Sequence, residues 1–150
     1  AGEEWALEVF RTHGKIYEAT ASQMFGVPLE RIRKGSPDYH YRQKGKVATL
    51  ALGYQGGTGS LISMGALRSG LTEEELPEIV ERWRGANPAI VQLWYTVEAA
   101  AWEVVRHGRR VAIQEGRLVL ARECDPENGL DFLTIRLPSG RKLYYEIGRE

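Results

Sequence analysis

The hydrophobic residues of this 150-residue chain change their spacing at about residue 110. Before that point they recur every three or four residues, a period that predicts packed helices. After it, short runs rich in β-branched and aromatic residues alternate with turn-forming residues, which predicts strands; these runs are 111–113, 118–120, 132–135 and 143–145. The sequence therefore predicts a mainly α protein with a small antiparallel β appendage, an α+β fold, divided into a helical region 1–109 and a β segment 110–150.

The longest predicted helix begins at Asn87-Pro88 and ends before Gly108. Its apolar residues cover a broad face, which suits burial under neighbouring elements. Trp94 and Trp102 lie on this helix, and we interpret them first as core or interface residues rather than as a platform for stacking bases.

A second helix, over about 37–53, carries the most distinctive side chains. Ser36-Pro37 is a capping side chain followed by proline at the first helical position, and Gly53 marks the end. Four residues follow at intervals of four and form a slanted stripe roughly 18 Å long on one face; they are Arg42, Lys46, Leu50 and Tyr54.

The charges of this stripe suggest a ligand. Asp38 lies four residues before Arg42, where the two can pair, but Lys46 has no acid at a helical neighbour position. Like charges four residues apart repel slightly, so an anion across both would stabilise the arrangement, and phosphate is the obvious candidate. A solvated surface with Leu50 and Tyr54 in the core is the alternative interpretation.

Opposite charges cancel over the whole chain, with 20 basic and 20 acidic residues. A local excess of positive charge lies between residues 31 and 46, where six cations face Asp38 alone; they are Arg31, Arg33, Lys34, Arg42, Lys44 and Lys46. Such a patch is either plain surface or a phosphate site. The glutamates after Thr72 predict an exposed helix start, with Glu75 completing a capping box, and no function.

Cysteine and histidine usage excludes several kinds of site. Cys124, in a predicted polar loop, is the single cysteine, so no internal disulfide forms and a reducing compartment is expected. The three histidines lie far apart, which argues against a metal site. With no apolar run long enough to cross a membrane and no recognisable signal peptide, we expect a cytoplasmic protein.

The spacing of Arg42, Lys46 and Tyr54 resembles Arg-x3-Lys-x3-Phe/Tyr-x3-Tyr, the fingers-helix motif of family A DNA polymerases, the bacterial DNA polymerase I group. Other segments are similar to landmarks of that family in the same order; they are 14–21, 25–28, Trp83, Asn87-Pro88 and 140–144. The sequence as a whole is most similar to the polymerases of tailed phages and prophages. The resemblance therefore implies the cytoplasm of a bacterium or of a bacterial host.

The resemblance implies roles for five residues. Arg42 and Lys46 would hold the triphosphate of the incoming deoxynucleotide, and Lys46 would also give a proton to the departing pyrophosphate. Tyr54 would contact the template and the nascent base pair. Tyr17 takes the place of a phosphate-contacting histidine, and Leu50 that of an aromatic residue on the sugar. Gln55 replaces a common glycine, so the helix end is expected to bend differently.

The family's catalytic metals are expected outside this sequence. The family holds two metal ions, here Mg²⁺, on a pair of aspartates, but Asp38, Asp125 and Asp131 match neither of its metal-binding motifs. The resemblance thus implies a fingers fragment from between those motifs, with no metal of its own and inactive alone. Its partners would be template-primer DNA, deoxynucleotide and the palm domain of the parent polymerase.

Two other classes of protein share some of these sequence features. A small helical DNA-binding module without an enzymatic parent would also carry basic helices, but the turn signals of a helix-turn-helix are missing. A P-loop hydrolase would need Gly-Lys-Ser/Thr at the end of the glycine-rich run 53–59, and the sequence has none there.

Overall fold

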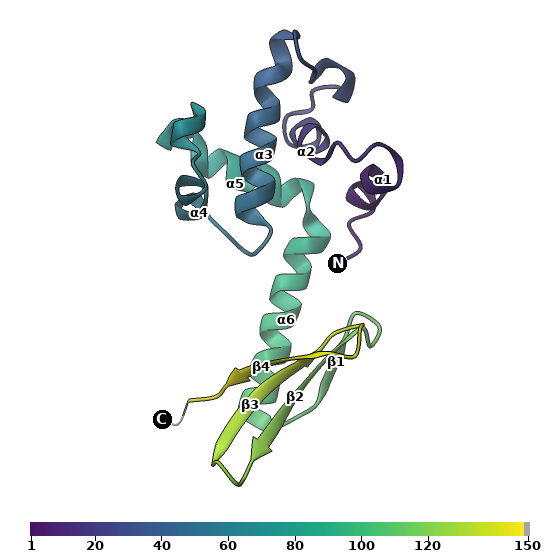
Figure 1. The fold of residues 1–150 in the computed structure, drawn as a ribbon, viewed down its shortest axis with the longest axis vertical. Helices are drawn as coiled ribbons and strands as arrows, with labels where there is room; N and C mark the ends of the chain where they lie inside the picture. The colour runs from purple at the N-terminus through teal and green to yellow at the C-terminus, as the bar shows by residue number, and fades with distance from the viewer. Residues whose placement is uncertain (149–150) are drawn as a thin grey trace. The chain divides into compact units, whose positions relative to one another are not determined.

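The computed structural model describes residues 1–148 and confirms a mainly helical chain with a small antiparallel sheet (Figure 1). It forms two compact units. The helical unit is Gly2–Val91, and the sheet unit contains Ala1 and the chain from Gln92 onward. The expected division at 109/110 follows the change from helix to strand, whereas the two units divide within a helix. Residues 149 and 150 of the predicted β segment lie outside the described residues.

The helical unit is built around α3 (His40–Leu52), which packs against α2 (Ile16–Phe25), α4 (Thr58–Ser63) and α5 (Leu76–Ala86). Figure 1 shows α3 between α2 and α4. The other elements are α1 (Glu4–Thr12), the 3-10 turns η1 (Leu29–Arg31), η2 (Pro37–Tyr39), η3 (Leu67–Ser69) and η4 (Glu73–Glu75), and the start of α6 (Pro88–His107). The most deeply buried side chains of the core include Ala21, Ala48, Leu52, Leu61 and Leu76.

A glycine sets the distance between α2 and α3. A Cβ atom added at Gly45 would lie 2.3 Å from the carbonyl oxygen of Tyr17 and 2.9 Å from Cβ of Ala21. Only a residue without a side chain lets the two backbones approach this closely. The approach brings the start of α2 against the first turns of α3, and this is where the candidate site lies.

The predicted start of the α3 segment is confirmed in its cap. The Ser36 hydroxyl accepts a hydrogen bond from the Asp38 amide at 3.2 Å, and Pro37 follows at the first position of η2. This 3-10 turn leads directly into α3 at His40. The cap therefore determines where Arg42 falls on the helix surface.

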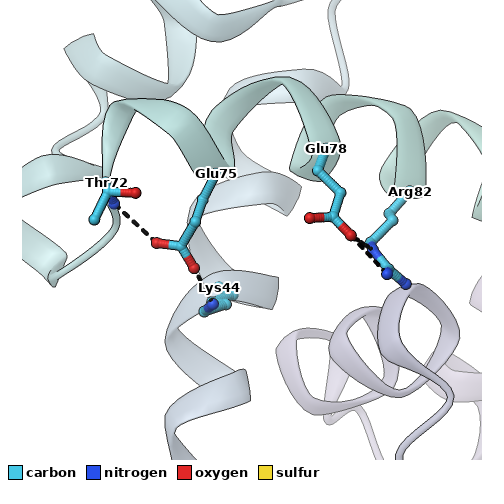
Figure 2. A network of polar contacts seen from close by, with 5 residues as sticks. All are labelled: Lys44, Thr72, Glu75, Glu78 and Arg82. Carbon is cyan, nitrogen blue, oxygen red and sulfur yellow. Dashed lines mark hydrogen bonds and ion pairs between the residues drawn. The ribbon is translucent and has the colours of Figure 1, made fainter.

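The predicted capping box at Thr72 is confirmed, and its glutamate, Glu75, also pairs with Lys44 of another helix (Figure 2). The Thr72 amide donates to Glu75 Oε2 at 2.9 Å, while Lys44 Nζ of α3 lies 2.6 Å from Glu75 Oε1. The Lys44 hydrogen bond, with that of the Thr72 amide, lowers the pKa of Glu75. Glu73 and Glu74 are exposed as predicted, whereas Glu75 is half-buried and also joins α3 to the start of α5.

Two side chains near the amino terminus form hydrogen bonds with the backbone where α5 ends and α6 begins. Trp5 Nε1 donates to the Ala86 carbonyl at 2.9 Å. Glu3 Oε2 accepts from the amides of Ala89 at 2.9 Å and Ile90 at 3.3 Å, which satisfies unpaired donors at the start of α6.

The sheet unit packs the later part of α6 against one face of a four-stranded antiparallel sheet of order β1-β2-β3-β4. Its strands are β1 (Val111–Ile113), β2 (Leu118–Asp125), β3 (Leu130–Arg136) and β4 (Lys142–Glu146). Leu120 pairs with Val111 on one side and with Ile135 on the other. These side chains point to one face of the sheet and pack around Ala100 and Val104 of α6.

Two details of the sheet unit differ from expectation. Cys124 lies in β2 rather than in a loop, and its thiol donates to Asp131 Oδ1 of β3 at 3.1 Å. This hydrogen bond raises the pKa of Cys124. Trp102 is 54% exposed, with the Arg106 guanidinium 4.6 Å from its ring centroid, so it is not a core residue of this unit. No helix in residues 1–148 is long and apolar enough to cross a membrane.

Candidate functional site

The first cation of the α3 stripe is already paired. Arg42 Nε donates to Glu18 Oε1 of α2 at 2.7 Å, and the two side chains are 31% and 17% exposed. This hydrogen bond raises the pKa of Arg42 above its ordinary value, although solvent partly screens the two charges. The predicted pairing of Arg42 with Asp38 is wrong, because the Asp38 carboxylate lies 2.7 Å from Arg31 Nη2 instead.

Tyr17 lies beside Arg42. The Arg42 guanidinium is 5.5 Å from the centroid of the Tyr17 ring, a cation–π contact. Tyr17 and Glu18 are consecutive at the start of α2, and the close approach at Gly45 holds both against α3. The structure thus brings Tyr17, Glu18 and Arg42 into one cluster.

Lys46 lies one turn further along α3 and, unlike Arg42, is not paired with a carboxylate in residues 1–148. Its side chain is half-buried, and within residues 1–148 no ion pair or hydrogen bond joins its ammonium group to another residue. The repulsion inferred from sequence is relieved by Glu18 on the Arg42 side only. Lys46 therefore keeps an unneutralised charge, which leaves its three N–H donors for water or a ligand.

The last two members of the stripe are open to solvent. Leu50, two turns after Arg42, is 44% exposed, so it is not an ordinary core residue. Tyr54 follows the end of α3 and is 96% exposed. An apolar side chain and a phenol ring are thus exposed beyond the two cations.

The turn after Tyr54 has an unusual backbone. Gln55 adopts φ of +62°, a left-handed conformation that favours glycine. Next to it, Gly56 leaves no room for a side chain, since an added Cβ would lie 2.1 Å from the Ala51 carbonyl oxygen. A tight turn therefore follows Tyr54 directly.

Sequence reasoning missed Glu18. Its pairing with Arg42 joins residues 24 positions apart and depends on how α2 packs on α3. The one signal in the sequence is Gly45, since a glycine in the middle of a helix points to a close approach of another backbone.

A concave surface adjoins the Arg42 end of the stripe. A cleft of about 600 Å³ is formed by the start of α2, η1 and the loop before α3. The side chains of Lys15, Arg33, Lys34 and Arg42 line it, together with the carboxylates of Glu18 and Glu30. Four cations against two acids give the cleft an excess of positive charge, which favours anions.

The arrangement suits binding of anions more than catalysis by itself. Arginine and lysine one helical turn apart offer a planar fork and a point charge, a combination that fits a polyphosphate. Within the described part of the chain, no three His, Cys, Asp or Glu side chains gather closely enough to hold a metal ion.

A comparison with known proteins gives the chain a context. Over 145 residues, 97% of its length, it is 60% identical to a protein named DNA polymerase from Bacillus phage SP02. The aligned part is 21% of that protein, so the chain spans about one fifth of the relative it matches. No protein-family model matches the chain.

Proposed function

We propose that this chain is the fingers region of a family A DNA polymerase of the phage type, and that Arg42 and Lys46 bind the triphosphate of the incoming deoxynucleotide. The observation that carries the proposal is Lys46, a cation without an ionic partner in residues 1–148, one turn from Arg42 on the same helix. The 60% identity to a segment of a phage DNA polymerase supports it independently.

The two cations have different tasks. Arg42 binds phosphate oxygens through its guanidinium, and since Glu18 occupies that group in the free chain, the nucleotide must share or displace this carboxylate. Lys46 neutralises the β and γ phosphates and, as a lysine with a proton to give, acts as general acid toward the departing pyrophosphate.

The remaining residues of the site contact the rest of the nucleotide and the template. The Tyr17 hydroxyl donates one hydrogen bond to phosphate without adding charge. Leu50, 44% exposed, packs on the sugar, and Tyr54, 96% exposed, lies against the templating base and the nascent pair. Leucine has no flat ring for stacking, so selectivity at the sugar is expected to be weaker than with an aromatic residue.

Chemistry requires parts outside this chain. We infer that the palm domain of the parent polymerase supplies the aspartates for Mg²⁺, which would stabilise the attacking and leaving oxygens. Closure of α3 over a correct base pair would then assemble the site from two domains. We expect the chain alone to be inactive, and the parent enzyme to act on template-primer DNA in the bacterial cytoplasm.

A titration tests nucleotide binding by this chain. Deoxynucleoside triphosphate added to the ¹⁵N-labelled chain should first shift the side-chain and amide signals of Arg42 and Lys46, with a dissociation constant on the order of 1 mM because the metal-binding half is missing. Lys46→Ala should weaken binding at least about fivefold, and Lys46→Arg, which keeps the charge, should weaken it less.

Arg68→Ala is the matched control, since it removes an exposed cation of the helical unit that is not a member of the stripe. Equal losses in Lys46→Ala and Arg68→Ala would mean that triphosphate responds only to net charge. That outcome, or signal shifts that spare Arg42 and Lys46, would contradict the proposed site.

A further inference from the structure

Arg33 and Lys34, in the loop before α3, border two depressions in the protein surface and have no role in the proposed nucleotide site. Besides the cleft of about 600 Å³ beside Arg42, a second depression of about 380 Å³ lies along the loop from η1 to η2. Glu30, Arg33 and Lys34 line both depressions. The two hollows are therefore adjacent and share Glu30, Arg33 and Lys34 as a common border; together they are called the basic groove.

The charges of the groove are unevenly paired. Arg42 is neutralised by Glu18, and Arg31 by Asp38. Within residues 1–148, Lys15, Arg33 and Lys34 have no ion pair, and all three are exposed. Three unpaired cations thus face one unpaired carboxylate, Glu30, across a surface whose floor contains the buried Ile32.

The shape of the groove indicates the kind of anion. A single phosphate would occupy one hollow and leave the other empty, whereas a strand with repeated charges can fill both hollows by passing Arg33 and Lys34, which line each of them. Grooves that bind single strands without regard to sequence combine such a cationic track with aromatic rings. Tyr39 lines the larger hollow and can supply one ring.

We propose that the basic groove binds the phosphodiester backbone of a single-stranded nucleic acid, with Lys15, Arg33 and Lys34 as its phosphate contacts. Lys46 and Tyr54 do not line the groove, and Arg42 lines only its larger hollow. The groove is a second site beside the candidate nucleotide site, and the proposal does not depend on nucleotide binding at α3.

Fluorescence anisotropy with labelled oligodeoxythymidylates of about 4 and 12 nucleotides, lengths within the usual footprints of such grooves, tests the proposal. The intact chain should bind the longer strand more tightly. Arg33→Ala/Lys34→Ala should weaken binding of the longer strand about tenfold at low salt and reduce the slope of log K against log salt by about 1.4, because two phosphate contacts are lost. Lys15→Ala should reduce the slope by about half of that.

Arg109→Ala/Arg110→Ala is the matched control, because it also removes two consecutive exposed cations but lies in the sheet unit. Its strand affinity and slope should stay close to those of the intact chain. All variants replace exposed side chains, and their thermal unfolding should be unchanged.

Three results would overturn the proposal. They are no strand binding by the intact chain, equal losses in the groove and control variants, or equal affinity for the short and long strands with full competition by inorganic tripolyphosphate. The last would reveal an isolated phosphate site. Lys46→Ala separates the two proposals, since it should leave strand binding intact whether or not it abolishes nucleotide binding.

Discussion

At the scale of single residues, the candidate site combines a paired and an unpaired cation. Glu18 holds the Arg42 guanidinium at 2.7 Å, while Lys46 has no such partner in residues 1–148. A carboxylate this close lowers the local positive potential that a phosphate would meet. Glu18 therefore competes with any anionic ligand of Arg42.

Glu18→Gln should raise the affinity of the chain for deoxynucleoside triphosphate about fivefold, because it removes the competing negative charge but keeps a hydrogen-bonding side chain. Calorimetric titration measures the change. Glu81→Gln, an exposed carboxylate of α5, alters net charge equally and should have little effect. Weaker binding by Glu18→Gln would mean that Glu18 orients Arg42 for the ligand instead of competing with it.

Gln55 also has a measurable consequence at this scale. Its φ of +62° is unfavourable for a residue with a side chain, so Gln55→Gly should stabilise the chain by up to about 1 kcal/mol in urea unfolding. Gln23→Gly, at an exposed position inside α2, should instead destabilise it by about 1 kcal/mol. A loss of stability in Gln55→Gly would show that contacts of the Gln55 side chain outweigh its backbone strain.

At the scale of elements, the site depends on one helix contact. Tyr17 and Glu18 reach Arg42 because α2 and α3 approach each other closely at Gly45. In the sheet unit, Arg122 of β2 and Asp131 of β3 form an ion pair across the two strands. Each contact can be tested with a single substitution.

Gly45→Ala should destabilise the chain by about 2 to 3 kcal/mol, since the new methyl group would overlap the Tyr17 carbonyl and force the helices apart. It should also weaken nucleotide binding. Gly85→Ala in α5, where an added Cβ meets nothing within 4 Å, should gain up to about 1 kcal/mol. Denaturant unfolding compares the two, and equal effects would contradict the close approach at Gly45.

The Asp131 carboxyl provides a test by pH. Hydrogen bonds from Arg122, and then from the Cys124 thiol, lower the pKa of Asp131 to about 2. A lowered pKa means that the contribution of this carboxylate to stability is complete above its unfolded pKa, about 4, and is lost as pH falls toward 2. Carbon-13 NMR of the carboxyl should show the low midpoint, and Arg122→Gln should return it toward 4; a midpoint near 4 in the intact chain would exclude the pair.

At the scale of the whole chain, sequence patterns predicted the α+β class and the capping of η2 and η4, because these depend on local periodicity and neighbouring residues. They did not predict Glu18 beside Arg42, Lys44 with Glu75, or the basic groove, because each joins segments that only packing brings together. The misplaced loop around Cys124 has a similar origin, since pairing with β3 extends β2 through polar residues.

The proposed action of Lys46 on the nucleotide is tested most directly by single-turnover nucleotide incorporation with the full-length polymerase that carries this segment. Lys46→Ala should reduce the rate of the chemical step at least about 100-fold, the usual contribution of a general acid, with affinity for template-primer DNA nearly unchanged. Lys46→Arg should retain nucleotide affinity better than rate. An unchanged rate in Lys46→Ala, with equal DNA binding, would contradict the account.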